Sequence, residues 1–347
     1  MKKVIMSVSA MLVCMFVVSA AMAEGPTMRV SGKAEIWVEA SDGLDSNKGD
    51  SKMKANELYV TFDGKFDNDV SAKLKLDGAD IVSNDGKVTS EKIVEEANFT
   101  FKHIAGSPVS LVIGKDEMPF GQDYDKMLSD PLVHNFEIDK VWGLNSSVDL
   151  AGIGSLGAAT YYHRNSASDR VGPDNELGDN YAVRLKLDKL IDAVAFQASF
   201  AQESYSELSV TDEADVTTVT PKDDETRVSV GVVIKVAPVN VAVEYVGVQN
   251  RKGMPGYDPA LVSVAGDVKV CDNVKLHAKY ERILEDADDA VEEDFFGAGL
   301  ECAVADGVAV FVEYLNYNSG DLKDASDLEV ADGSTEDSVK VGVRGKF

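Results

Sequence analysis

The sequence predicts an all-β fold, a transmembrane antiparallel β-barrel of about sixteen strands. Three observations predict it: apolar and polar residues alternate along most of the chain, short turns alternate with long polar segments, and the chain begins with an export leader. A mean hydropathy of −0.12 and the lack of a long apolar run after residue 23 exclude a bundle of membrane helices. They do not exclude a membrane barrel, because its strands are apolar on one face only.

The first residues have the three parts of a secretory signal peptide. Met1-Lys2-Lys3 is charged, Val4 to Val18 is apolar, and Ala21-Met22-Ala23 provides small residues for cleavage. An uncleaved membrane anchor is the alternative, but no cluster of stop-transfer charges follows. We therefore expect residues 1–23 to be removed and residues 24–347 to form the outer-membrane barrel.

Alternation with a period of two is clear between residues 227 and 236. One row is apolar and the other is polar or small, with Val233 as the mismatch. A soluble β-sandwich would give the same pattern, so periodicity alone does not separate a protein core from lipid. The apolar row contains Val228, Val230, Val232, Ile234 and Val236, and the other row contains Arg227, Ser229, Gly231 and Lys235.

The connections favour the barrel. Long polar segments such as Tyr205 to Glu225, Glu285 to Asp294 and Ser319 to Asp337 alternate with short turns, which is typical of outer-membrane barrels. With a first strand at Met28 to Glu39 and a last strand at Ser338 to Phe347, the count is about sixteen and both termini are periplasmic. The predicted short turns are Asp67-Asn68, Ala105-Gly106, Ile153-Gly154, Ile191-Asp192, Pro238-Val239, Asp272-Asn273 and Ala305-Asp306-Gly307.

The net charge of −26 argues against a nucleic-acid binder, which needs a basic face. If the apolar rows face lipid, the polar rows line the lumen with both signs of charge, and the excess of acid falls in the loops. The loop acids are interpreted as a solvated surface or as sites of divalent-ion bridging, although no twelve-residue calcium loop is present. The first acidic group contains Glu203, Glu207, Asp212, Glu213, Asp215, Asp223, Asp224 and Glu225.

Three ordered motifs lie between Val94 and about Asn165. An acidic stretch ending at Ala97 is followed by a Gly-Lys-x-x-x-Pro-Phe-Gly segment and then by Asp-Pro-Leu. This order resembles the LbtU-like siderophore porin family and is more loosely similar to phosphate-selective porins of the O and P type. The resemblance covers about a fifth of the chain and implies a porin fold. The motif residues are Gly114, Lys115, Pro119, Phe120, Gly121, Asp130 and Pro131.

The segment Phe120 to Lys140 forms the third long loop. The resemblance implies that it folds into the lumen, and the alternative is an ordinary external loop. An inward loop would set acids opposite basic residues of the wall, and such charges determine pore selectivity. We expect a pore constriction with weak cation selectivity. Its acidic side would be Glu117, Asp123, Asp125, Asp130 and Glu137, and its basic side Lys73, Lys75, Arg184 and Arg227.

The predicted function is a porin, a water-filled channel for passive diffusion of small hydrophilic solutes and ions. The alternatives are a substrate-selective porin for a siderophore and a non-conducting structural or adhesive barrel. Phosphate is disfavoured because acidic loops repel anions at the mouth. No enzyme is expected: Gly-x-Ser-x-Gly is absent, and the histidines are scattered. They are His103, His134, His163 and His277.

The expected location is the outer membrane of a Gram-negative-type bacterium. The expected partners are membrane lipid and lipopolysaccharide, small hydrophilic solutes, the barrel-assembly machinery and, in a homotrimer, further copies of the chain. We expect no cofactor, metal or nucleic acid. Cys271 and Cys302 could form a disulfide in this oxidising compartment, but one strand separates them and puts them near 10 Å, beyond the roughly 7 Å limit.

Overall fold

The computed structural model describes most of the chain from residue 26 onwards. The described residues are 26–41, 51–78, 93–121, 132–138, 140–162, 178–205, 208–211, 217–220, 223–284, 293–319, 322–323, 329–331 and 334–347. Within these ranges, no helix has the length and apolar character needed to cross a membrane. The helices described are short 3-10 turns: η1 Ile104–Gly106, η2 Leu132–Asn135 and η3 Arg251–Gly253.

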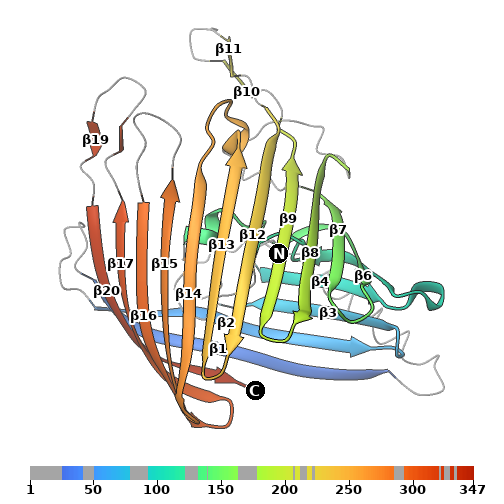
Figure 1. Cartoon of the computed structure of the whole chain (residues 1–347), viewed down its shortest axis with the longest axis horizontal. Coiled ribbons are helices and arrows are strands. Elements are labelled where there is room, and N and C mark those ends of the chain that lie inside the picture. Colours follow the sequence, from blue (N-terminus) through green and yellow to red (C-terminus); the bar gives the residue numbers. More distant parts are fainter. Residues whose placement is uncertain are drawn as a thin grey trace.

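The predicted barrel is confirmed. Sixteen antiparallel strands of the described chain form one closed sheet, in which each strand pairs with the next and the last pairs with the first (Figure 1). The barrel strands are β1 Thr27–Ser41, β2 Ser51–Lys65, β3 Val70–Asp77, β4 Val94–Phe101, β5 Val109–Asp116, β6 Val141–Asp149, β7 Ser155–Tyr161, β8 Asn180–Ile191, β9 Val194–Glu203, β12 Glu225–Val236, β13 Val239–Gln249, β14 Ala260–Cys271, β15 Val274–Leu284, β16 Glu293–Ala305, β17 Val308–Ser319 and β20 Ser334–Lys346.

Closure joins the two ends of the chain. β1 pairs with β20 over a register that includes Glu35 opposite Arg344. The amide of Gly32 donates to the carbonyl of Phe347 at 2.9 Å, and the amide of Phe347 donates to the carbonyl of Gly32 at 3.1 Å. The C-terminal phenylalanine therefore takes part in closing the sheet, which leaves no unpaired strand edge in the lipid.

Every predicted short turn joins two consecutive barrel strands. The connections β2–β3, β4–β5, β6–β7, β8–β9, β12–β13, β14–β15 and β16–β17 fall at the predicted positions. In Figure 1 these turns lie at the bottom of β8–β17, and the longer connections lie at the top. β1 begins and β20 ends beside the short turns, since Thr27 is opposite Lys65 and the amide of Lys346 donates to the carbonyl of Gly307 at 2.7 Å.

Two of the segments predicted as long polar loops contain additional strands. β10 Leu208–Thr211 pairs with β11 Thr217–Thr220, and β18 Leu322–Lys323 pairs with β19 Glu329–Ala331. The first hairpin is rich in threonine and valine, which are enriched in strands. The many polar and acidic residues of these segments predict loops, although short stretches within them favour strands.

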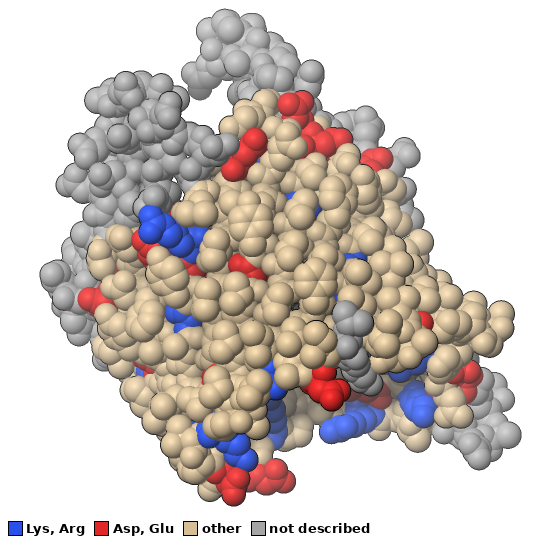
Figure 2. All heavy atoms as spheres, viewed as in Figure 1, with Lys and Arg blue, Asp and Glu red and all other residues tan. Residues whose placement is uncertain are grey.

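The two faces of the wall differ as the alternation predicts. On β12, Val230 is 41% exposed on the outer face, whereas Ser229 is 0% exposed on the inner face. The wall that faces the viewer in Figure 2 is mostly uncharged, with acidic residues towards its upper edge and basic residues more frequent near its lower edge. This apolar band is the surface that contacts lipid.

The prediction that only polar rows face inwards is wrong in one part of the wall. Val246, Leu261 and Ile283 are neighbours across β13–β15, and all three are buried on the inner face. The sequence Ala242-Val-Glu-Tyr-Val-Gly-Val248 has no charged or polar residue on either alternating row apart from Glu244 and the hydroxyl of Tyr245, which is the signal for this exception. An apolar inner patch requires something inside the barrel to cover it.

Candidate functional site

A segment between β5 and β6 covers the apolar patch. We call its described parts, residues 117–121 and 132–138, the inward segment. Its apolar side chains are at most 5% exposed and form one cluster with Val246, Leu261 and Ile283 of the wall. The prediction that this segment enters the barrel is confirmed for these residues. The buried side chains of the segment are Met118, Phe120, Leu132, Val133, Phe136 and Ile138.

The first part of the inward segment lies against β8 and β9. The amide of Gly121 donates to the hydroxyl of Ser199 at 3.1 Å. Arg184, one of the predicted basic residues, approaches the carbonyl of Gly121 at 3.5 Å, the upper limit for a hydrogen bond. Arg184 therefore touches the segment but holds it only weakly.

The second part of the inward segment is fixed more firmly, to β12 and β15. One terminal nitrogen of Arg227 donates to the carbonyls of Phe136 and Glu137 at 3.1 and 2.9 Å. The amide of Val133 donates to Glu281 at 3.2 Å. Short polar contacts to main-chain groups satisfy donors and acceptors that would otherwise be unpaired once the segment leaves water.

Arg227 also forms a buried ion-pair cluster. Its guanidinium contacts Glu203 at 2.9 Å and donates to Glu225, and both carboxylates are 1% exposed. The hydroxyl of Tyr205 donates to Glu225 at 2.7 Å, and that of Tyr161 lies 3.3 Å from Glu203. One cation thus faces two carboxylates, so the cluster carries a formal excess of negative charge.

This cluster corrects the sequence interpretation. Glu203 and Glu225 were expected among the solvated acids of a surface loop, but Glu203 is the last residue of β9 and Glu225 the first of β12, and both are buried inside the barrel. They lie opposite each other in the β9–β12 ladder. The strands β9 and β12 continue beyond the stretch in which apolar residues alternate with polar ones. Acidic residues that point inwards at these strand ends therefore look, in the sequence, like residues of the acidic loop.

Lys73 and Lys75 lie on β3 and make a separate group. Both pair with Glu96, at 2.6 and 3.8 Å respectively, and Lys75 also lies 3.7 Å from the centre of the Tyr59 ring. Lys140, just after the inward segment, pairs with Glu95. Three of the four basic residues predicted for the constriction, Lys73, Lys75 and Arg227, therefore form ion pairs with carboxylates of the barrel wall.

Of the predicted acidic side, two members are described. Glu117 is exposed, directly after β5, and Glu137 is half-buried in the second part of the inward segment. Asp123, Asp125 and Asp130, as well as Pro131 of the family motif, lie outside the described residues. One of these acids thus lies at the start of the inward segment and the other near its end.

The remaining motif residues have structural explanations. Gly114 has φ +134°, and a β-carbon there would be 2.2 Å from the carbonyl oxygen of Ala97, so only glycine fits. Ala97 and Lys115 are directly opposite in the β4–β5 ladder, and the Lys115 ammonium donates to the carbonyl of Val94 at 2.6 Å. The acidic stretch that ends at Ala97 and the Gly-Lys segment thus pack against each other on neighbouring strands. Pro119, Phe120 and Gly121 are buried where the chain turns inwards.

One contact on the inner wall was not predicted. His277 of β15 and Glu313 of β17 meet at 3.1 Å across Gly299 of β16, and both are buried. Cys271 and Cys302 are free thiols, with β15 between them. Among the described residues, no three or more His, Cys, Asp or Glu side chains are grouped to hold a metal ion.

A closed sixteen-stranded barrel with a segment folded inside it defines the class of outer-membrane diffusion channels. The chain belongs to the Gram-negative porin family, whose model matches residues 9–344. It is an outer-membrane porin, a channel for passive diffusion of small hydrophilic solutes. No curated protein matches its sequence.

Solved structures of low sequence identity have the same fold. The outer-membrane channel DcaP of Acinetobacter baumannii is similar with a TM-score of 0.68 and 13% identity, over 94% of this chain and 99% of that one. A loop-deletion mutant of OmpT, an outer-membrane protein of Vibrio cholerae, gives 0.65 and 16%, over 93% and 99%. An anion-selective porin from Comamonas acidovorans gives 0.65 and 11%, over 93% and 100%.

Proposed function

We propose that the pore is narrowest beside the inward segment and that it weakly prefers cations there. The observation that carries this proposal is the Arg227 cluster. The guanidinium that could have balanced the acids of the segment is already shared between Glu203 and Glu225. Between Glu117 and Glu137 the sequence has five acids and one lysine, so this segment adds more negative than positive charge to the lumen.

Other bases of the wall also have carboxylate partners, although two lysines share a single carboxylate of β4. Lys73 and Lys75 share Glu96, and Lys279 pairs with Glu281 at 2.9 Å in the same region as Val133. A ring of carboxylates that exceeds its bases raises the local cation concentration and lowers that of anions. The preference is weak because Arg184 and the paired lysines still reduce the potential.

The reversal potential of the reconstituted channel in a KCl gradient tests this proposal. In the triple variant Asp123→Asn, Asp125→Asn and Asp130→Asn, we expect a shift towards anions, larger at 0.01 M than at 0.1 M salt. The Debye length grows from about 10 Å to about 30 Å over that range, so charges act over a larger part of the lumen.

A triple variant in another loop is the matched control. Asp286→Asn, Asp288→Asn and Asp289→Asn remove the same charge from the connection between β15 and β16. We expect this control to shift the reversal potential much less. Equal shifts in the two variants would show that surface charge in general, and not a constriction at the inward segment, sets the preference.

A substrate-selective function for a siderophore is the second candidate, and it rests on the motif resemblance between Val94 and Asn165. The structural explanations for Gly114 and Lys115 weaken it, because strand packing alone accounts for these residues. The KCl current through the reconstituted channel, measured with increasing ferric siderophore, tests this candidate. Block of the current at micromolar siderophore would favour it over general diffusion.

The proposed assembly is a homotrimer embedded in lipid and lipopolysaccharide and inserted by the barrel-assembly machinery. A trimer form is described for OmpT of Vibrio cholerae, which has the same fold at 15% identity and a TM-score of 0.61. Mass measurement of the detergent-solubilised protein distinguishes a trimer from a monomer.

A further inference from the structure

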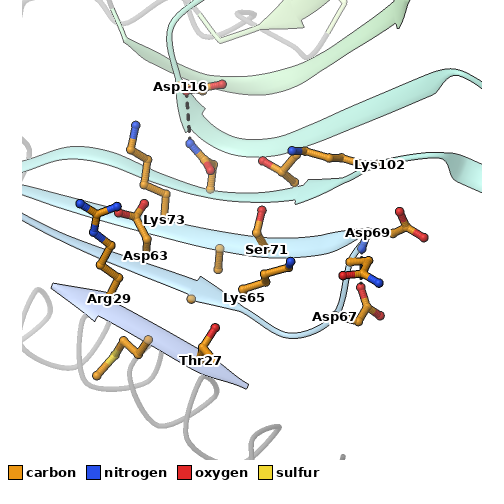
Figure 3. Close-up of a pocket in the computed structure, with 16 residues that line it drawn as sticks. Thr27, Arg29, Asp63, Lys65, Asp67, Asp69, Ser71, Lys73, Lys102 and Asp116 are labelled. Atoms are coloured by element: carbon orange, nitrogen blue, oxygen red, sulfur yellow. Dashed lines mark hydrogen bonds between the residues drawn. The ribbon is translucent and has the colours of Figure 1, made fainter. Parts of the chain in front are cut away.

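A hollow of about 570 Å³ lies at the short-turn end of the barrel, on the inner face of β1–β4 (Figure 3). It is separate from the Arg227 cluster, which lies on β9 and β12, and its lining includes Asp116, the last residue of β5 before the inward segment. Its inner rows follow the register: Arg29 opposite Asp63 and Asp63 opposite Lys73, with Lys65 opposite Ser71 and Ser71 opposite Thr100 in the row nearer the turns.

Acids and bases line the hollow in equal number, but most of the acids are already engaged. Asp67 accepts from the amides of Asp69 and Val70 at 2.7 and 2.6 Å, which shapes the β2–β3 turn. Asp69 contacts His103 at 2.8 Å, and Asp116 accepts from Asn98 at 3.2 Å. These carboxylates have partners that do not belong to the bases of the hollow.

The bases are less occupied. Lys73 pairs with Glu96, but Arg29, Lys65 and Lys102 are exposed and make no ion pair with any described residue. Asp63, beside Arg29, is the one lining acid for which the described chain provides no partner. Arg29, Lys65 and Lys102 are therefore cations of the hollow without an ion pair to a described residue, and the carboxylates bonded to neutral groups keep their charge.

Hydroxyl groups complete the site. In Figure 3, Ser71 lies between Lys65 and Lys102, and the ammonium ends of both lysines are on the side of the hollow. Thr100 is the neighbour of Ser71 in the β3–β4 ladder. Two ammonium groups and two hydroxyls provide only donors or flexible donor–acceptors, a combination that suits a phosphate or carboxylate group.

We propose that Lys65, Lys102 and Ser71 form a subsite for the anionic group, phosphate or carboxylate, of a small solute that passes the short-turn mouth. This site goes beyond the cation preference of the constriction. An anionic or zwitterionic solute would meet acid at the inward segment and base at this mouth. Its binding is weak, since the lysines are exposed and a channel must release what it binds.

Block of the single-channel KCl current by inorganic phosphate tests the subsite. The mature protein is reconstituted in a planar bilayer, and phosphate is added to each side in turn. We expect a stronger block from the side that bears the short turns. In Lys65→Gln/Lys102→Gln the half-blocking concentration should rise about fivefold, because each exposed charge contact contributes roughly a twofold to threefold factor.

Lys235→Gln is the matched control, because Lys235 is an exposed lysine at the same end of the barrel but on β12. It should leave the block unchanged, and Ser71→Ala should weaken it about twofold, as expected for one lost neutral hydrogen bond at an exposed site. Broadening of the phosphate ³¹P resonance by detergent-solubilised protein provides a second readout that does not need conduction. An absence of block and broadening in the wild type, or an equal loss in Lys235→Gln, would overturn the proposal.

Discussion

Arg227 of β12 donates to the main-chain carbonyl of Glu137 at 2.9 Å, and this bond ties the inward segment to the barrel wall. The same guanidinium holds Glu203 and Glu225, which are buried. Arg227 therefore contributes both to the position of the segment and to the neutralisation of these two acids. Arginine suits this place because its planar fork binds several acceptors at once, whereas lysine offers a single point of charge.

Arg227→Ala should destabilise the folded barrel by about 3–5 kcal/mol, because it leaves two buried carboxylates without their cation. Arg227→Lys should recover part of this loss. We also expect greater current noise in single-channel records of Arg227→Ala, since the second part of the inward segment loses two main-chain contacts. Urea unfolding in detergent micelles measures the stability.

Arg184→Ala is the control for this prediction, because Arg184 also reaches the inward segment but at the limiting distance of 3.5 Å. Its cost should be below about 1 kcal/mol, as for an exposed or weak polar contact. Similar losses for Arg184→Ala and Arg227→Ala would mean that the buried cluster has no special role in holding the segment.

Gly299 allows His277 and Glu313 to meet across β16. A β-carbon at position 299 would be 2.1 Å from the His277 ring nitrogen Nε2 and 2.8 Å from the Glu313 side chain. Gly299→Val should therefore push this buried pair apart and cost about 1–3 kcal/mol, the usual range for overpacking. Gly345→Ala is the control, because a β-carbon at position 345 meets nothing within 4 Å, and its stability should match the wild type.

The fold could be predicted from the sequence because its signals are local. A turn such as Asp272-Asn273 is set by its own residues, and alternation along Val228 to Ile234 assigns each side chain to a face. The number of short turns predicts the number of strands, and the sheet is expected to close into a barrel because a sheet in lipid tolerates no unpaired edge.

The site was less predictable because its contacts join distant parts of the chain. Arg227 and Glu137 are 90 residues apart, and no pattern near either residue indicates that they meet. Glu203 and Glu225 have the composition of their acidic neighbours, and only the register of β9 with β12 separates them from the loop. Sequence alternation assigns a side chain to a face of the wall but not to its partner across the lumen.

Cys271 and Cys302 should remain reduced in the folded protein. Cys271 is opposite Val274, and Val274 is opposite Cys302, so β15 lies between the two thiols. Neighbouring strands are about 4.8 Å apart, which puts the pair near 10 Å and beyond disulfide range. Titration of the denatured, unreduced protein lacking residues 1–23 should find both thiols, and a mass lower by two hydrogen atoms before reduction would contradict this prediction.

The last prediction concerns Phe347, whose main chain closes the barrel against Gly32 while its ring is 75% exposed. Deletion of Phe347 removes both hydrogen bonds to Gly32 and should cost about 1–3 kcal/mol when the protein folds into detergent, at roughly 0.5–1.5 kcal/mol for each bond. Phe347→Ala keeps the main chain, so its stability in detergent should stay within about 1 kcal/mol of the wild type. In cells, however, Phe347→Ala should lower the amount of assembled barrel, because the C-terminal aromatic residue resembles the signal that the assembly machinery reads. Heat-modifiability on gels measures the folded fraction in both settings. Normal assembly of Phe347→Ala in cells would show that the ring is not needed for assembly and that Phe347 acts only through its main-chain bonds to Gly32.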